Sequence, residues 1–226
     1  MQKVIVVGNG KLADAIRDGL PGLKDFAVER WENAPRYDGA SAVVVHVGSG
    51  RQIDEVIAYC ASRKVPLIQG ATGIEFHYRD SYRFPLVNAP NFNILMIKFM
   101  HMLKKQGSIF KGYRISVEES HQASKKTTPG TAFEIAGALG VSPAEIASVR
   151  EEKTQSNRYG IPAEHLKRHA VHQVTISDGG DAKIFMRTEV FGLEPYVRGL
   201  AEIIGCAIKL ENRVYDVFDL IESGIL

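Results

Sequence analysis

The chain has little cysteine, little net charge and no long apolar run, and each shortage argues against one class of protein. Only two of its 226 residues are cysteine, Cys60 and Cys206, and both lie in apolar segments far apart. A disulfide framework is therefore not expected, and a reducing cytoplasm is the expected location. The first residues run directly into Gly8 without the cleavage pattern of a secretory signal. No apolar run approaches the roughly 20 residues that span a bilayer, so no membrane contact is expected.

The charges nearly balance, which gives no reason to expect nucleic acid as a partner. The chain has 28 Lys and Arg against 26 Asp and Glu, a formal net charge of +2. Basic residues nevertheless outnumber acidic ones between residues 98 and 170. Four of the seven histidines lie in or just beyond that stretch: His121, His165, His169 and His172. Such a segment suits a small anionic ligand, although exposed lysines that bind nothing are more common.

Apolar runs that end at glycine alternate with helical patterns in the first ninety residues. The expected strands cover residues 3–7, 26–28, 42–47, 65–68 and 83–88, and the expected helices cover residues 11–20 and 53–63. Strands that alternate with helices and end in glycine-rich turns are typical of a doubly wound parallel sheet. The sequence therefore predicts an α/β protein with an N-terminal Rossmann domain.

The pattern changes after Asn91, which indicates a second domain of the α+β class. Helices are expected over residues 94–106 and 131–139, and strands over residues 113–118, 169–176 and 183–190, the last two joined as a hairpin. The tail, residues 196–226, is expected to be helical and to pack against the first domain. We expect a dinucleotide-binding domain from residues 1–92 and 205–226, and a substrate-binding and oligomerisation domain from residues 93–204.

A glycine-rich turn connects the first expected strand with the first expected helix. Gly8, Asn9, Gly10, Lys11, Leu12 and Ala13 fit the pattern G-x-G-x-x-A. The first glycine permits a tight turn, and the second lets a pyrophosphate approach the backbone at the helix N-terminus. The motif predicts a dinucleotide site, with a merely structural turn as the alternative.

The choice of nucleotide depends on Glu29 and Arg30, which end the second expected strand. Glu29 lies 19 residues after Gly10, where a carboxylate accepts the ribose hydroxyls of NADH. The neighbouring guanidinium can bind the 2′-phosphate of NADPH, so both nucleotides are expected to bind. The alternative is a solvated pair. Gly48 follows the third expected strand, and Gly70 and Thr72 follow the fourth. These residues either line the nicotinamide end of the nucleotide or form ordinary turns.

A second cluster can donate protons and hold a carboxylate. His121 and Lys125 lie four residues apart in an expected loop, and Gly130 and Thr131 then open a helix with free N–H groups and a hydroxyl. An isolated loop histidine is more often a surface residue. The neighbouring lysine and Gly-Thr turn favour a catalytic site instead.

In these motifs the chain resembles the dihydrodipicolinate reductase family. The family's E-x-H-H-x-x-K-x-D-A-P-S-G-T-A block is similar to residues 119–132, and its G-T-T-G turn to residues 70–73. Three further segments match in order along the chain: Asn88–Asn93, Arg158–His165 and Tyr215–Ile221.

The resemblance implies reduction of dihydrodipicolinate, a small cyclic dicarboxylate imine, with NADH or NADPH in lysine and diaminopimelate biosynthesis. It implies a homotetramer assembled through the sheets of the second domain. His121 would be the proton donor and Lys125 would stabilise the developing negative charge. The resemblance also assigns Gln122, Gly130 and Thr131 to substrate binding, places Asn88, Asn91 and Phe92 at the cofactor, and puts His165 near the substrate pocket.

The chain departs from the family block in two places. Gln122 stands where the family has a second histidine, and the run at residues 126–129 is one residue shorter. Two alternatives therefore remain: a reductase of another cyclic imine derived from an amino acid, or a nucleotide-binding homologue without turnover. The intact His121 and Lys125 argue against the second. No metal is expected, because no cysteine or carboxylate extends His165 and His169 into a zinc-type spacing.

Overall fold

The computed structural model describes residues 1–23, 26–36, 42–72, 82–126 and 129–226, which form two compact units. Unit 1 contains Met1–Ile94 and Leu193–Leu226, and unit 2 contains Leu95–Gly192. The first division lies close to the expected one at residue 92. The second lies at residue 192 rather than 204, because the helix that follows residue 193 belongs to unit 1 and not to the second domain.

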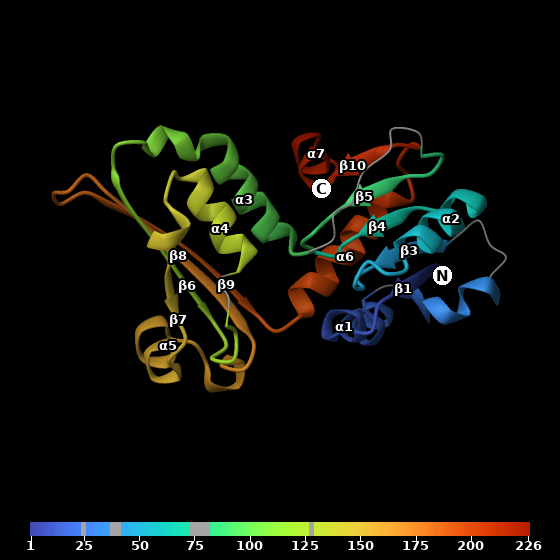
Figure 1. The fold of residues 1–226 in the computed structure, drawn as a ribbon, viewed down its shortest axis with the longest axis horizontal. Helices are drawn as coiled ribbons and strands as arrows, with labels where there is room; N and C mark the ends of the chain where they lie inside the picture. The colour runs from blue at the N-terminus through green and yellow to red at the C-terminus, as the bar shows by residue number, and fades with distance from the viewer. Residues whose placement is uncertain (24–25, 37–41, 73–81, 127–128) are drawn as a thin grey trace. The chain divides into compact units, whose positions relative to one another are not determined.

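Unit 1 is built on a six-stranded sheet in the order β10-β5-β4-β3-β1-β2, with every strand pair parallel (Figure 1). Its strands are β1 (Gln2–Val7), β2 (Phe26–Arg30), β3 (Ala42–His46), β4 (Leu67–Gln69), β5 (Leu86–Asn88) and β10 (Val214–Asp216). The expected α/β fold is confirmed. The tail was expected to be helical throughout, but Val214–Asp216 pairs with β5 and closes one edge of the sheet.

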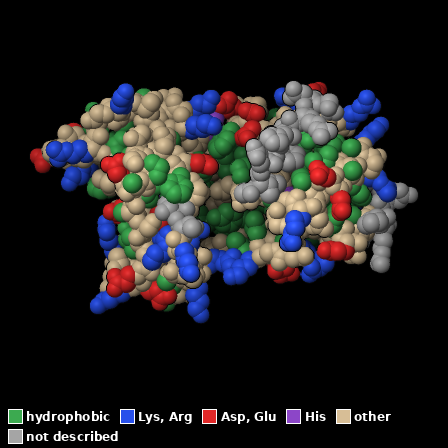
Figure 2. Space-filling model, viewed as in Figure 1, with side chains coloured by type: hydrophobic (Ala, Val, Ile, Leu, Met, Phe, Trp, Pro, Cys, Tyr) green, Lys and Arg blue, Asp and Glu red, His purple; other side chains and the backbone are tan. Residues whose placement is uncertain are grey.

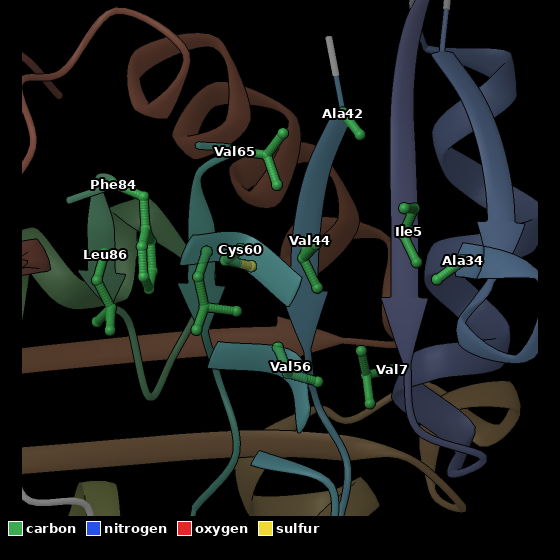
Figure 3. Packing of buried hydrophobic residues seen from close by; sticks show 11 residues of the cluster. Ile5, Val7, Ala34, Ala42, Val44, Val56, Cys60, Val65, Phe84 and Leu86 are labelled. Atoms are coloured by element: carbon green, nitrogen blue, oxygen red, sulfur yellow. The ribbon is translucent and has the colours of Figure 1, made fainter. Parts of the chain in front are cut away.

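Both faces of this sheet are buried, as a parallel sheet requires. On one face, Ile5, Val7 and Val44 pack with Val56 and Cys60 of α2 (Ile53–Arg63) (Figure 3). The alternate strand residues point the other way and are also buried: Val4, Val6, Val43 and Val45. Each buried valine contributes about 1.5–3 kcal/mol relative to exposure, so this core fixes the strand ends that carry the turns.

The other helices of unit 1 are α1 (Lys11–Gly19), α6 (Glu194–Ala207) and α7 (Val217–Glu222), with 3₁₀ turns at Leu20–Gly22 and Trp31–Arg36. Gly19 of α1 lies against Val197 of α6, so the N-terminal and C-terminal parts of the chain pack together. Among the described residues, no helix is both long and apolar enough to cross a membrane.

Unit 2 contains a four-stranded sheet in the order β7-β6-β8-β9 (Figure 1). Its strands are β6 (Arg114–His121), β7 (Ala147–Val149), β8 (His169–Ser177) and β9 (Lys183–Phe191). Its helices are α3 (Ile94–Gln106), α4 (Gly130–Ala138) and α5 (Glu152–Tyr159), with 3₁₀ turns at Gly107–Phe110, Pro143–Glu145 and Ala163–His165. The expected β8–β9 hairpin is confirmed, whereas β7 and α5 were not predicted.

Candidate functional site

The nucleotide-site candidates of unit 1 gather at the carboxyl edge of its parallel sheet. β1 pairs with β2 on one side and with β3 on the other, and β3 pairs with β4. The turns that follow these strands therefore lie at the same edge, where ligands of doubly wound folds bind. Gly8, Glu29 with Arg30, Gly48 and Gly70 all occupy this edge.

The turn after β1 has a shape that only glycine fits. Gly8 has φ +129°, and a Cβ there would lie 2.9 Å from the backbone nitrogen of Gly48. Gly10 caps α1, and a Cβ at this position would meet no atom of the described residues within 4 Å. The guanidinium of Arg17 donates to the Gly8 carbonyl at 2.9 Å and ties the turn to the helix. The open space beside Gly10, at a helix N-terminus, fits a pyrophosphate.

Glu29 and Arg30 lie where the sequence places them, on the last two residues of β2. They are in register with Ile5 and Val6 of β1, next to the glycine turn. The Asn33 amide donates to Glu29 Oε2 at 3.5 Å, and Arg30 is exposed. Both side chains are thus close to the turn, and the carboxylate retains lone pairs for ribose hydroxyls.

Three of the candidates assigned by resemblance have clear structural contacts. Asn88 donates to Asp216 at 3.1 Å and joins β5 to β10, and Asn91 Oδ1 accepts the backbone N–H of residue 93 at 2.9 Å. Phe92 is buried under Gly70, where a Cβ would lie 2.2 Å from its ring. These contacts shape the sheet edge. Thr72 is exposed beside them, and Gly73 lies outside the described residues.

A buried polar pair beneath this edge was not predicted. His46, at the end of β3, shares a hydrogen bond of 2.6 Å between its Nδ1 and Oε1 of Gln69, at the end of β4. Burial lowers the pKa of His46, and the bond to Gln69 opposes that shift only in part. The imidazole is therefore neutral at pH 7, with Nδ1–H as donor to the amide oxygen.

In unit 2, His121 is the last residue of β6, so its expected position in a loop is wrong. The strand continues because residues 114–121 pair with β8 along their whole length. His121 Nδ1 lies 2.7 Å from Oε2 of Glu119, which is fully buried two residues earlier. Arg150, just after β7, donates to both oxygens of Glu119, at 3.1 and 2.5 Å, and the Ser148 hydroxyl donates to Oε1.

These donors keep the buried Glu119 ionised. Burial by itself would raise the pKa of this carboxyl. Hydrogen bonds from His121, Arg150 and Ser148, together with the positive charge of Arg150, outweigh burial and lower the pKa of Glu119 to about 2. A fixed negative charge therefore lies beside the candidate proton donor at neutral pH.

The remaining candidates of unit 2 lie on the segment that follows β6. The chain turns after His121, and this turn is closed by a bond of 2.9 Å from the Lys125 N–H to the Gln122 carbonyl. Arg150 Nε donates to the Lys125 carbonyl at 3.0 Å. Residues 127–128 of the block lie outside the described residues. Gly130 and Thr131 form the first turn of α4, which packs against β6. The structure thus places the N–H groups of a helix N-terminus in the same unit as His121.

Two further histidines lie near the end of β6, His172 on the same face of the sheet as His121 and His169 on the other. His172 of β8 meets it edge to face, with ring centroids 5.6 Å apart, and shares a bond of 3.2 Å with Thr188. His169 bonds to the Ser120 hydroxyl at 3.0 Å and to the His165 carbonyl at 3.0 Å. No cluster suited to hold a metal ion occurs in the part of the chain that the structure describes.

The burial of His172 makes the free energy of unfolding depend on pH. Burial lowers its pKa from 6.5 to about 4, with a smaller contribution from the neighbouring His121. The unfolded chain then binds more protons than the folded one between pH 6.5 and 4, so stability is fully present above pH 6.5 and is lost as pH falls through that range. The whole shift corresponds to at most about 3 kcal/mol.

We therefore expect the free energy of unfolding of a His172→Phe variant to fall less steeply between pH 6.5 and 4 than that of the wild type. Phenylalanine keeps the ring and cannot be protonated, although it loses the bond to Thr188. Urea denaturation at several pH values measures both slopes. Equal slopes would contradict the assignment of this acid sensitivity to His172.

Four residues of the cluster were missed by sequence reasoning: Ser148, Arg150, His172 as a neighbour of His121, and Gln155 of α5, whose amide donates to the His121 carbonyl at 2.7 Å. Arg150 lies 31 residues after Glu119, and no local spacing connects them. The only available signal was the basic excess of this region. Lys and Arg side chains of unit 2 are interspersed with Asp and Glu on the face shown in Figure 2, so the excess forms no single basic patch there.

Fold and site together define an α/β protein with a dinucleotide-binding type of sheet and a second unit that carries a histidine-carboxylate cluster. The family described as dihydrodipicolinate reductase, C-terminus, matches residues 95–221, more than half of the chain. The chain belongs to the dihydrodipicolinate reductase family.

Known relatives agree with this assignment. The 4-hydroxy-tetrahydrodipicolinate reductase 1 of Arabidopsis thaliana chloroplasts is 27% identical over 179 residues, covering 71% of this chain and 52% of that protein. The chain thus spans about half the length of the curated relatives that it matches. A dihydrodipicolinate reductase from Paenisporosarcina sp. TG-14, solved with dipicolinate, has a TM-score of 0.65 at 15% identity, covering 96% of this chain and 97% of that one. A meso-dapdh mutant from Clostridium tetani E88, solved with DAP, has a TM-score of 0.59 at 11% identity, over 100% and 96%. Both show the same fold.

Proposed function

We propose that the protein is an NAD(P)H-dependent reductase of dihydrodipicolinate, acting in lysine and diaminopimelate biosynthesis. The observation that carries the proposal is His121 held by a buried, ionised carboxylate in the same unit as a helix N-terminus. Membership of the family and the names of its relatives support the substrate class. The glycine turn of unit 1 supports the cofactor class.

The residues at the sheet edge of unit 1 fit a pyridine dinucleotide. Residues 8–12 would hold the pyrophosphate in the open space at the start of α1, and Glu29 with Arg30 would bind the adenosine ribose. The nicotinamide end would lie against the remaining candidates at the strand ends, Gly48, Gly70, Thr72, Asn88 and Asn91, and the buried Phe92 would support Gly70 from beneath. When bound, this cofactor supplies a hydride.

The residues of unit 2 would bind the dicarboxylate and supply the proton. Gly130 and Thr131 would hold one carboxylate through N–H groups and the hydroxyl, and the Gln122 amide would donate to the substrate without adding charge. His121 would protonate the substrate after hydride addition, from the ring nitrogen that does not face Glu119. Lys125 would stabilise the negative charge that develops on the substrate.

The decisive assay follows oxidation of NADH and NADPH with freshly generated dihydrodipicolinate. We expect turnover with both nucleotides and kcat/KM values within about tenfold of each other, on the order of 1.4 kcal/mol. Glu29 favours free ribose hydroxyls, whereas the exposed Arg30 accepts a phosphate. A preference beyond about a hundredfold in either direction would show that this reading of the pair is wrong.

A second candidate substrate is another cyclic imine derived from an amino acid. Gln122, in place of the histidine of the family block, favours it, because a neutral amide binds a carboxylate less strongly than a charged imidazole. The same assay with a panel of cyclic imines separates the two candidates. A higher kcat/KM for a monocarboxylate imine would favour the second.

We also propose that the sheet of unit 2 assembles the protein into a homotetramer. β9 is an edge strand, and two of its apolar side chains, Ile184 and Phe185, are 46% and 66% exposed. Exposed apolar side chains on a long edge strand favour pairing with another copy. Light scattering should give four times the chain mass of 24.9 kDa, and Phe185→Glu should lower it. A monomeric wild type would exclude this assembly.

A further inference from the structure

Both oxygens of the buried Glu119 carboxylate receive hydrogen bonds, and the donors come from separate parts of unit 2. Oε2 accepts from His121 Nδ1 at 2.7 Å and from Arg150 at 3.1 Å, and Oε1 accepts from Arg150 at 2.5 Å and from Ser148. An ionised carboxylate only accepts, so Nδ1 of His121 must carry the proton of that bond. The nitrogen that can exchange a proton with a ligand is then Nε2.

Arg150 connects this carboxylate with the segment that carries Lys125. Its Nε donates to the Lys125 carbonyl at 3.0 Å, and Nη1 also donates to the Val149 carbonyl at 3.0 Å. Gln155 of α5 adds bonds of 2.7 Å to the His121 carbonyl and 3.1 Å to that of Val149. Arg150, just after β7, thus holds both the Glu119 partner of His121 and the turn with Lys125, and Gln155 of α5 holds the strand end at His121.

We propose that Glu119 and Arg150 are the positioning residues of the reductase site. Glu119 fixes the Nδ1–H tautomer and the ring orientation of His121, and Arg150 holds Glu119 and the backbone of Lys125 in one geometry. Neither touches the substrate. The kinetic consequences rest on the proposed function, whereas the tautomer does not. The His121 ring also meets that of His172 on β8, whereas His169 lies on the other face of the sheet and senses His121 only through its charge.

The isosteric variant Glu119→Gln tests the first part, because an amide presents a donor where the carboxylate has only acceptors. If its nitrogen replaces Oε2, His121 Nδ1 must become the acceptor and the proton moves to Nε2. If its nitrogen replaces Oε1, it faces the Arg150 and Ser148 donors and expels them. The adjacent Glu118 is a matched control, because it pairs with Arg158 at 2.8 Å and, as the neighbouring residue of β6, points to the opposite face of the sheet from Glu119.

Nitrogen-15 NMR of the imidazole groups shows which ring nitrogen of His121 carries the proton, and it needs no substrate. In the wild type and in Glu118→Gln at alkaline pH, we expect His121 to be protonated at Nδ1. In Glu119→Gln we expect the Nε2–H form or a mixture of both forms. A wild-type His121 that is mainly Nε2–H would overturn the proposal, whatever the activity of the protein.

Kinetics of Arg150 variants test the second part. Arg150→Ala should lower kcat about 10–100-fold, the usual cost of losing a partner that orients a functional group, with nucleotide affinity unchanged. Millimolar guanidinium should restore part of that loss, because it can refill the space beside Glu119. Arg158→Ala is the control and should show neither effect.

Arg150→Lys covers the case in which Arg150→Ala does not fold. Lysine keeps the charge but cannot bond to Glu119 and to the Lys125 carbonyl together, so kcat should still fall. A folded Arg150 variant with wild-type kcat would overturn the positioning role. An inactive wild type that shows the Nδ1–H tautomer would instead remove the proposed function and leave the assignment of Glu119 in place.

Discussion

Replacing His121 by alanine is expected to lower kcat by ~10²–10⁴, the usual worth of one positioned general acid. The loss corresponds to on the order of 3–5 kcal/mol in the activation barrier. The fold should persist, because the buried Glu119 keeps its bonds to Arg150 and Ser148 when the imidazole is removed. Steady-state kinetics with any imine that the wild type reduces measures the effect.

The matched variant is His121→Asn. Its amide can still donate a hydrogen bond to Glu119, as Nδ1 of the imidazole does, but it has no second ring nitrogen to give a proton to the substrate. It should be as inactive as His121→Ala and at least as stable. Nucleotide affinity, followed by fluorescence on the same samples, should equal that of the wild type. Near-normal turnover of either variant would remove the mechanism proposed for this site.

Lys125→Ala should cost a similar factor, and comparison with the double variant shows whether the two residues act on one step. If His121 supplies the proton and Lys125 stabilises the charge that this proton neutralises, the double variant should lose less than the product of the single losses. Independent, fully multiplicative losses would place Lys125 in substrate binding rather than in the proton-transfer step.

The sheet of unit 1 was predictable because its strands are short apolar runs that end at glycines. Ile5 and Val44 lie in runs whose alternate residues are also apolar, which is the pattern of a parallel sheet buried on both faces. β10 was not predictable in the same way. It has three residues, and it forms a strand because it pairs with β5, more than a hundred residues earlier.

The candidate site likewise has residues that local sequence spacing reveals and residues that only the pairing of distant strands brings together. His121, Lys125 and the Gly130 turn lie within a dozen residues of one another, and local spacing is enough to propose them as a group. Arg150 acts on this group only because β7 pairs with β6 in parallel and sets Ser148 opposite Glu119. Register between distant strands is a tertiary property, so residues that orient the reacting groups are hidden from sequence spacing while the reacting groups are not.

The two glycines of the first turn should fail in different ways when each is replaced by alanine. At Gly8 the backbone has φ +129°, and a Cβ would lie 2.9 Å from backbone atoms of Val47 and Gly48. Gly8→Ala should therefore lower the free energy of unfolding by about 1–3 kcal/mol or more, since neither backbone segment can move without disturbing β1 or β3.

Gly10→Ala should leave stability within about 0.5 kcal/mol of the wild type and still lower nucleotide affinity by at least about tenfold. The backbone of Gly10, at φ −90° and ψ 171°, is one that alanine adopts, and its Cβ would meet no described atom within 4 Å. That open space is where the pyrophosphate would approach the start of α1. Urea denaturation without nucleotide and NADH fluorescence titration measure the two quantities on the same preparations. A Gly10→Ala protein that binds NADH like the wild type would move the nucleotide away from this turn, because nothing else among the described residues competes for the space.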